Sequence, residues 1–322
     1  MLVLGLQGSP RKRGNTSLLL STFMDEARRI GAQTLTIDVD KKNIQPCKEF
    51  QICEKDGYCP IDDDMASEIY FLLRQADLIL LASPIFFYSV TAQIKALIDR
   101  SQTFWARKYR LGIDDPGRKW RRGFMFALGA TKGENLFQGV NLTAKYFFDA
   151  VGADYLGSLT YRQIEKKGDI TKHSSALSEA KSKANELVMP LVNRKKVIFI
   201  CRENACRSQM ASAFAQHYAG DRIDVMSGGS EPADRINGVM EEVMREKKID
   251  MAFRKPKTIE EAVGDSNPDL AFTMGCEDAC SVFPGTKIED WDLPEPSGES
   301  IDFMRKIRDD VEGRILKLIE KL

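Results

Sequence analysis

Residues 201–208, CRENACRS, combine two thiols, a guanidinium and a hydroxyl directly after the apolar run VIFI. A strand that ends at a cysteine, followed by a short loop and a helix, can wrap backbone N–H groups around a tetrahedral oxyanion. Arg207 could hold two oxygens of that anion with its planar guanidinium. The same positive potential favours the thiolate over the thiol at Cys201. We therefore predict a thiolate nucleophile in an oxyanion-binding loop.

The residues near this loop indicate how the thiolate is supported. The chain has two histidines, His173 and His217, and neither lies in a motif, so we expect no imidazole base. Ser208 is placed to donate a hydrogen bond to the thiolate, and Asn204 to brace the loop. The alternative is a pair of buried structural cysteines beside a helix cap. A zinc site is not expected, because this half of the chain has no CxxC pair.

The Cys-x5-Arg-Ser spacing and the continuation CRSQMA resemble the thiol-coupled arsenate reductases built on the low-molecular-weight protein tyrosine phosphatase fold. The resemblance covers residues 195–322. It implies that Cys201 attacks arsenate and that a second thiol then attacks the sulfur of the adduct. Arsenite leaves and a disulfide remains.

The segment TMGCEDACSVFPG favours the reductase over a phosphatase, because a phosphatase needs one thiol and a reductase needs more. By the resemblance, Cys276 is the attacking thiol and Cys280 the resolving one. Cys206, inside the loop, is the competing partner. The alternative for Cys276 and Cys280 is that they are inert buried residues.

The resemblance also implies a general acid that protonates the departing oxygen. The family has an aspartate before a proline, whereas this chain has Glu295 before Pro296, with Asp292 nearby. Glu203 stands where the family usually has glycine, and its carboxylate could tune affinity or exclude phosphate. Two alternatives to arsenate reduction are a phosphomonoester or phosphotyrosine phosphatase and a non-catalytic oxyanion-binding redox module.

The first half carries a second set of polar loops. Residues 8–17, GSPRKRGNTS, supply hydroxyls, an amide, cations and helix-opening N–H groups, which suit a phosphate monoester although neither GxxxxGK[ST] nor GxGxxG is present. The alternative is a solvated turn with a helix cap. Two further loops follow predicted strands, SPIFFYSV from residue 83 and GATKGEN from residue 129. Together the three loops predict a slot for a phosphate tail and a flat ring.

These loops resemble the NADPH-dependent FMN reductase and iron–sulfur flavoprotein family, over roughly residues 1–190. The resemblance implies a flavodoxin-like fold, FMN as cofactor, NADPH or NADH as electron donor, and a homodimer formed through the flavin domain. The FMN phosphate would be held by Ser9, Arg11, Asn15, Thr16 and Ser17. The isoalloxazine would be flanked by Pro84, Ile85, Phe86, Tyr88, Gly129 and Thr131.

The first half also has a cysteine-rich segment, PCKEFQICEKDGYCPIDDDM. The iron–sulfur relatives have CxxCxxC followed by a fourth cysteine, whereas here Cys47, Cys53 and Cys59 remain and Phe50 takes the second place. Three thiolates leave one iron site without a cysteine. We therefore favour a packed loop or a redox-active pair over an iron–sulfur cluster, and we predict no metal site.

Short apolar runs alternate with amphipathic helical segments along the whole chain, which predicts α/β architecture with parallel, doubly wound sheets. The pattern restarts at Lys196. We therefore predict a flavodoxin-like domain over residues 1–192 and a low-molecular-weight phosphatase-like domain over residues 195–322. The predicted strands are LVLGL, TLTIDV, LILLAS, GFMFAL and YLGSL in the first domain, and VIFI, IDVMS and DLAFTM in the second.

The totals exclude several classes of function. The 322 residues include 47 lysines plus arginines and 47 aspartates plus glutamates, so no net charge favours nucleic acid or a membrane surface. The N-terminal sequence lacks the features of a signal peptide, and LILLASPIFF is too short to span a bilayer. We expect a cytoplasmic enzyme whose seven cysteines serve chemistry more than structural disulfides.

The two resemblances together suggest one electron path. A flavin domain collects two electrons from NADPH, and an arsenate reductase accumulates one disulfide per turnover. The hypothesis is that the first domain reduces the disulfide of the second, directly or through Cys47, Cys53 or Cys59. The alternative reductant is thioredoxin or a small thiol.

Overall fold

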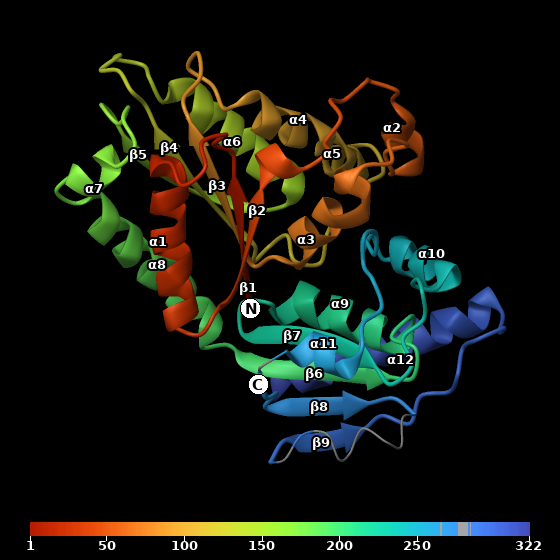
Figure 1. Cartoon of the computed structure of the whole chain (residues 1–322). Helices are drawn as coiled ribbons and strands as arrows, with labels where there is room; N and C mark the ends of the chain where they lie inside the picture. The colour runs from red at the N-terminus through yellow and green to blue at the C-terminus, as the bar shows by residue number, and fades with distance from the viewer. Residues whose placement is uncertain (265, 276–282, 284) are drawn as a thin grey trace. The chain divides into compact units, whose positions relative to one another are not determined.

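The computed structural model describes residues 1–264, 266–275, 283 and 285–322 (Figure 1). The chain divides into two compact units. The first comprises Met1–Gly112 and Arg118–Asn193, and the second comprises Ile113–Gly117 and Arg194–Leu322. The segment Ile113–Gly117 belongs to the second unit because it pairs with that unit's backbone: the Asp114 carbonyl accepts a hydrogen bond from the N–H of Asp250 at 2.8 Å.

The first unit is built on a parallel five-stranded sheet with strand order β2-β1-β3-β4-β5. The strands are β1 (Leu2–Gln7), β2 (Gln33–Asp38), β3 (Leu78–Pro84), β4 (Arg122–Leu128) and β5 (Asp154–Tyr161). The three central strands are apolar and buried along nearly their whole length, as strands covered by helices on both faces must be. This order is the flavodoxin-like one, so the predicted fold of the first half is confirmed.

Helices cover both faces of this sheet (Figure 1). One face carries α1 (Asn15–Arg29), α7 (Asp169–Lys172) and α8 (Ala176–Val192), which share a core with the sheet. The other carries α3 (Tyr70–Gln75), α4 (Ala92–Arg100), α5 (Gln102–Tyr109) and α6 (Gln138–Val151). Three short helices complete the unit: η1 (Val39–Lys41), α2 (Ile52–Asp56) and η2 (Met65–Ile69).

The second unit has a parallel four-stranded sheet with strand order β7-β6-β8-β9. Its strands are β6 (Lys195–Cys201), β7 (Ile223–Gly229), β8 (Leu270–Thr273) and β9 (Lys287–Asp290), and its helices are α9 (Arg207–Ala219), α10 (Gly238–Glu246), α11 (Ile259–Val263) and α12 (Ile301–Glu320). The sequence did not predict β9, whose KIED residues form a short and mostly exposed strand without an apolar run. The predicted parallel α/β class is otherwise confirmed.

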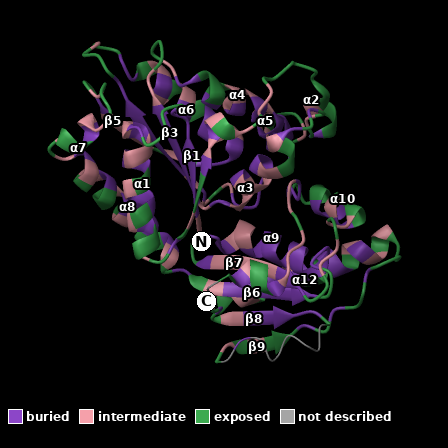
Figure 2. Cartoon of the chain, viewed as in Figure 1, coloured by how far each residue is buried: buried purple, intermediate pink, exposed green. Residues whose placement is uncertain are grey.

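Strand β6 is buried from Val197 to Cys201 (Figure 2). It separates two cores because successive side chains of a strand point to opposite faces of the sheet. Phe199 and Cys201 pack with α9, α10 and α12, whereas Ile198 and Ile200 pack with α11. The Phe199 ring lies 5.7 Å from the Trp291 ring. Cys201 is thus placed at the end of the central strand, on the α9 side.

Among the residues that the structure describes, none of the helices combines the length and the apolar character that a membrane-crossing segment requires. The longest, α12, has 20 residues and alternates charged with apolar positions. Its apolar stripe is used inside the second unit, where Met304, Ile307, Val311 and Ile315 join the core shared with α9.

Replacing Phe199 by alanine should lower the free energy of unfolding of the second unit by ~3–5 kcal/mol, because a fully buried ring is lost from a closely packed core. The measurement is denaturant unfolding followed by Trp291 fluorescence, with Trp105→Phe and Trp120→Phe as background. Leu316→Ala is the control: Leu316 is 44% exposed, and its loss should change stability by no more than about 0.5 kcal/mol. Equal effects of the two variants would contradict the assigned core.

Candidate active site

The cysteine loop connects the end of β6 to the start of α9. Cys201 is 2% exposed, and its sulfur lies 3.0 Å from the Ser208 hydroxyl oxygen. The same hydroxyl accepts a hydrogen bond from the Asn204 amide at 2.8 Å. Because that bond occupies a lone pair of the Ser208 oxygen, the Ser208 proton is available to the sulfur of Cys201. This arrangement suits a thiolate.

Asn204 holds the loop in its shape. Its backbone is left-handed, with φ of 48°, a conformation that asparagine tolerates better than most residues. Its side-chain oxygen accepts from the Lys257 N–H at 2.9 Å and from the Gln209 amide at 3.1 Å. The side chain of the predicted bracing residue therefore contacts three parts of the second unit: Ser208, Gln209 and the backbone of Lys257.

Arg207 leaves one donor open. It is 5% exposed; one terminal nitrogen donates to the Leu293 carbonyl at 3.0 Å and the other pairs with the Glu295 carboxylate. Its Nε is buried and has no hydrogen-bond partner within the described part of the chain. Helix α9 also begins without a side-chain cap, at Cys206. An oxyanion in the loop would satisfy both the guanidinium and the helix N–H groups.

The two predicted acids differ in position. The Glu295 carboxylate contacts Arg207 and accepts from the Ser297 N–H at 3.2 Å, with its side chain 55% exposed. Asp292 is exposed, and its backbone is left-handed, with φ of 40°. Glu203 is also exposed. Of these carboxylates, Glu295 is the one that contacts the anion-binding arginine.

Cys206 faces away from the open side of the loop. Its sulfur lies 3.4 Å from the Met304 sulfur, and burial, with a further contribution from nearby Cys201, raises the pKa of the Cys206 thiol. Cys206 therefore stays protonated at neutral pH. Cys276 and Cys280 lie outside the described residues. The residue before them, Gly275, is described, and a Cβ placed on it would lie 3.3 Å from a terminal nitrogen of Arg207.

The two histidines take no part in this site. His173 packs edge-on against Tyr161 and His217 against Tyr218, with ring centroids 4.8 Å and 4.9 Å apart. The groups that contact or lie near Cys201 are therefore the Ser208 hydroxyl and Arg207, and the thiolate stays a prediction.

Sequence reasoning did not identify Gly229 as part of the loop support. A Cβ at this position would lie 2.5 Å from the Arg202 carbonyl oxygen and 2.8 Å from the Asn204 nitrogen, so glycine lets two backbones meet. The N–H of Gly229 also donates to the Lys257 carbonyl at 2.9 Å. The signal that could have identified it is the Gly-Gly pair directly after the predicted strand IDVMS.

The predicted flavin loops of the first unit also meet. One pocket of about 110 Å³ is lined by seven of the predicted residues, Ser9, Arg11, Asn15, Thr16, Pro84, Ile85 and Phe86. Ser17 lines an adjacent pocket of about 230 Å³ together with Lys12 and Arg13. Leu128, the last residue of β4, and Ala130, in the third loop, also line the first pocket. The predicted Gly129 lies between them in the sequence, and the predicted Thr131 is exposed.

The start of α1 offers a phosphate cradle. This helix has no side-chain cap at Gly14, so its first N–H groups are open to an anion. Arg11 and Asn15 are partly committed elsewhere, because they donate to the carbonyls of Glu165 and Lys166 at 2.9 Å and 2.8 Å. These residues fit the phosphate of a mononucleotide.

Aromatic side chains lie beside this cradle. Phe86, Phe87 and Tyr88 are at least half exposed, although their rings are large and apolar. They lie in the loop after β3, where Phe86 and Ser89 form a two-residue bridge. Such a surface fits a planar ring system.

Replacing Gly229 by alanine should weaken phosphate and arsenate binding by about 10- to 100-fold, because the new Cβ displaces the loop backbone by a fraction of an ångström or more. Calorimetric titration of the full chain with each oxyanion measures the effect. Gly238→Ala is the matched control, since a Cβ there meets nothing within 4 Å. Unchanged affinity in a folded Gly229→Ala protein would contradict the assigned loop.

Comparison with known proteins matches the two halves of the chain to two different families. Residues 1–160 match the family model for NADPH-dependent FMN reductase, and residues 196–322 match that for low molecular weight phosphotyrosine protein phosphatase. Arsenate reductase 1 of Bacillus cereus is 34% identical over 132 residues, 40% of this chain and 96% of that protein. The glutaredoxin arsenate reductase of Synechocystis is 34% identical over 130 residues, 40% of this chain and 98% of that protein.

An iron–sulfur flavoprotein of Methanocaldococcus jannaschii is 41% identical over 102 residues, 32% of this chain, and the match spans 52% of that protein's length. The likeness to the flavoprotein thus concerns one segment of it, whereas the likeness to the reductases covers nearly all of each. Through residues 196–322 the chain belongs to the family of the arsenate reductases, which shares the low molecular weight phosphotyrosine protein phosphatase model, and its residues 1–160 match the model for NADPH-dependent FMN reductase.

Proposed function

We propose that residues 195–322 reduce arsenate to arsenite through Cys201 and that residues 1–192 supply the electrons from NADPH or NADH. The observation that carries the proposal is the loop in which the Cys201 sulfur faces the Ser208 hydroxyl at 3.0 Å while the buried Nε of Arg207 has no partner among the described residues. This is a nucleophile beside an open anion site.

The first step is attack of the Cys201 thiolate on arsenic. A sulfur–arsenic bond forms, and one oxygen of arsenate departs as water after protonation. The N–H groups of the loop and Arg207 hold the remaining oxygens and offset their negative charge. Ser208 stabilises the thiolate before attack, which removes the need for a histidine base.

Glu295 is the proposed general acid. It lies against Arg207 at the edge of the loop, and its carboxyl group is half exposed to water. Protonating the departing oxygen turns hydroxide into water, a better leaving group. Asp292, the other predicted acid, is exposed and takes no such role in the proposal.

The second step transfers two electrons to arsenic. A second thiol attacks the Cys201 sulfur, the sulfur–arsenic bond breaks, its electron pair stays on arsenic, and arsenite leaves as a disulfide forms. Cys206 is unsuited to this role, because its pKa is raised by burial and its sulfur contacts Met304. We assign the attack to Cys276, which directly follows Gly275 beside Arg207, and the resolving thiol to Cys280.

The first unit would hold FMN in the pocket at the start of α1, with the phosphate on the helix N–H groups and Ser9 and the ring beside Pro84 and Phe86. When bound, FMN accepts a hydride from NADPH or NADH and returns electrons to a disulfide. Pairing of two chains through this unit is part of the proposal. An external thiol is the second possible reductant, as the name of the Synechocystis relative indicates for that protein.

The same Cys-x5-Arg loop would serve a phosphatase, since phosphate and arsenate have nearly the same shape and charge. The phosphatase description of the matched family makes this the second candidate function. A phosphatase needs only Cys201, whereas the reductase needs Cys276 and Cys280 as well. Phosphomonoester hydrolysis that survives Cys276→Ser and Cys280→Ser without any arsenate reduction by the native chain would favour it.

Arsenate should stimulate anaerobic NADPH oxidation by the FMN-loaded full chain without added thioredoxin, and Cys201→Ser should abolish the stimulation. The reason is that each turnover leaves a disulfide that consumes two electrons. Absorbance of NADPH and the arsenite formed are measured together. If arsenite forms only when thioredoxin or glutaredoxin is added, the reductase assignment stands and the internal electron supply fails.

Glu295→Gln should lower kcat for arsenate reduction by about 100- to 10,000-fold, the usual contribution of a general acid. Glutamine keeps the shape of the glutamate side chain but cannot act as an acid. Asp292→Asn is the matched control and should leave kcat close to that of the native chain, since asparagine keeps the left-handed backbone. The reverse pattern would assign the acid to Asp292.

A further inference from the structure

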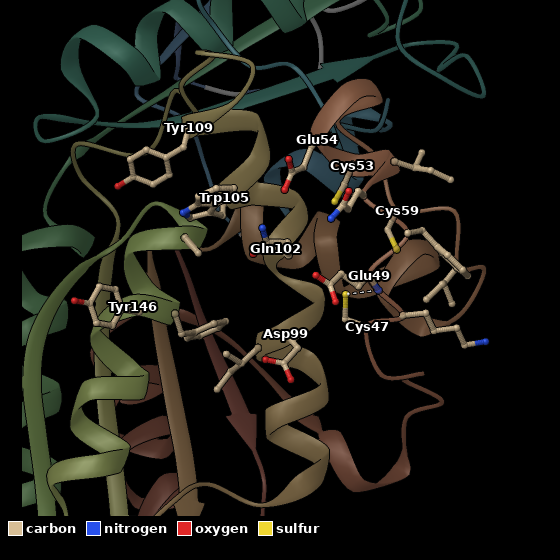
Figure 3. Close-up of a pocket in the computed structure, with 18 of the residues that line it drawn as sticks. Cys47, Glu49, Cys53, Glu54, Cys59, Asp99, Gln102, Trp105, Tyr109 and Tyr146 are labelled. Carbon is tan, nitrogen blue, oxygen red and sulfur yellow. Dashed lines mark hydrogen bonds between the residues drawn. The ribbon is translucent and has the colours of Figure 1, made fainter.

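All three cysteines of the first unit line one pocket. The pocket has a volume of about 750 Å³, and Cys47, Cys53 and Cys59 contribute to its wall (Figure 3). Cys53 lies in α2, and the other two lie in the segments on either side of it. Figure 3 shows the three sulfur atoms on the sides of these segments that face one another. Burial and the charges of Cys59 and Cys47 raise the pKa of Cys53, so the three thiols are electrostatically coupled.

Two buried arginines hold the segment that carries these thiols. Arg100, 1% exposed, donates to the carbonyls of Gln45 and Ile61 at 3.0 Å and 3.3 Å and forms a fully buried ion pair with Asp63. Arg107, also 1% exposed, donates to the carbonyl of Gly57 at 2.9 Å. The segment is therefore fixed near its beginning, its middle and its end while its sulfurs face the pocket.

Tight turns bound the short helix between the cysteines. Gln51 before α2 and Gly57 after it both have left-handed backbones, with φ of 59° and 75°. Residues 42–51, which precede α2, contain no helix or strand. Cys47 thus sits on irregular backbone, which can adjust to a ligand, whereas Cys53 and Cys59 sit next to the anchored turns.

The number of thiols decides which ligand chemistry fits. Structural zinc and iron–sulfur clusters take four protein ligands, and the fourth place of the relatives' pattern is Phe50, which is 54% exposed and cannot coordinate. Within the described residues no group of three His, Cys, Asp or Glu is spaced to hold a metal ion. Trivalent arsenic needs only three thiolates, in a pyramid with a lone pair in the fourth direction, and it gains its sulfur bonds one at a time. The sulfurs must therefore close on the arsenic after the first bond forms, and the irregular backbone at Cys47 allows this movement.

No excess positive charge draws an anion to this pocket. Four carboxylates and two lysines contribute to its wall, and three of the carboxylates are ion-paired, Asp99 with Lys95, Asp149 with Lys108 and Glu54 with Arg110. Such a wall offers an arsenate anion no net attraction. Arsenous acid is uncharged at neutral pH and needs none. The pocket therefore suits the uncharged product of the second unit's proposed reaction better than its anionic substrate.

We propose that Cys47, Cys53 and Cys59 bind trivalent arsenic as a trithiolate. Arsenous acid exchanges its three hydroxyl groups for three thiols; three sulfur–arsenic bonds form, three water molecules leave, and no oxidation state changes. The source of the arsenic rests on the proposed arsenate reduction. The binding chemistry rests only on the three thiols and the pocket.

The test uses the full chain with the other four cysteines replaced by serine, namely Cys201, Cys206, Cys276 and Cys280, so that only the pocket thiols remain. The reduced protein is treated with arsenite alone, without arsenate, NADPH or FMN. Intact-protein mass spectrometry should show one arsenic bound with the loss of three hydrogens. X-ray absorption at the arsenic edge should show three sulfur neighbours and no oxygen.

Cys53→Ser in this background should leave at most a two-sulfur adduct that retains a hydroxyl, with an affinity at least about tenfold lower, or ~1.4 kcal/mol. Glu49→Gln is the matched control from the same wall and should bind arsenic as the background does. Failure to bind arsenite, with all three thiols titrating as reduced and the fold intact, would overturn the proposal. An adduct unaffected by Cys53→Ser would overturn it as well.

A third arm distinguishes arsenic from iron. If ferrous iron and sulfide assemble a stable cluster on the same three thiols and arsenite cannot displace it, the pocket is an iron site and the proposal is wrong. Because no arm uses arsenate, arsenite binding and arsenate reduction can fail separately. A chain that binds arsenite but reduces no arsenate would keep the site and lose its proposed source of arsenic.

Discussion

The predicted site of the second unit depends on how a buried thiolate would be compensated. Cys201 is almost fully buried at the end of β6, and a charge in such a place is costly unless donors and positive charge surround it. Ser208, Arg207 and the start of α9 supply these in place of a histidine. Asn204 and Gly229 then hold the loop backbone so that the donors face inward. Most of the residues assigned to the site satisfy this one requirement.

Both units place their predicted anion sites at the same kind of junction. The carboxyl ends of parallel strands and the N-termini of the following helices lie at one edge of each sheet, where N–H groups are open. In the first unit this edge is the start of α1, without a side-chain cap. In the second it is the start of α9, also without one. The two folds would thus offer a phosphate-like group similar surroundings. They differ in the side chains next to it, which are aromatic in the first unit and the Cys201 thiol in the second.

Buried arginines have two distinct uses in this chain. In the first unit, Arg100 and Arg107 bind backbone carbonyls and a carboxylate, and they fix an irregular segment on the core. In the second, Arg207 contacts the Leu293 carbonyl and the Glu295 carboxylate beside the cysteine loop. Arg100 and Arg207 each keep a buried Nε without a hydrogen-bond partner among the described residues, so this feature alone does not separate the two roles. Position separates them: Arg100 lies at the end of α4 and anchors a chain segment, whereas Arg207 opens α9 directly after the loop that carries Cys201.

The sequence by itself determined the parallel α/β class, the restart of the pattern near Lys196 and the Cys-x5-Arg-Ser loop, because periodic apolar runs and a contiguous motif are local properties. It could not decide between Glu295 and Asp292 or rank Cys206, since these depend on which side chain lies near Arg207 or Met304 after folding. It also missed β9, whose few charged residues form a strand only because β8 pairs with them. Tertiary structure decided what faces the three cysteines of that segment, because side chains from α4, α5 and α6, far away along the chain, complete the pocket that the cysteines line.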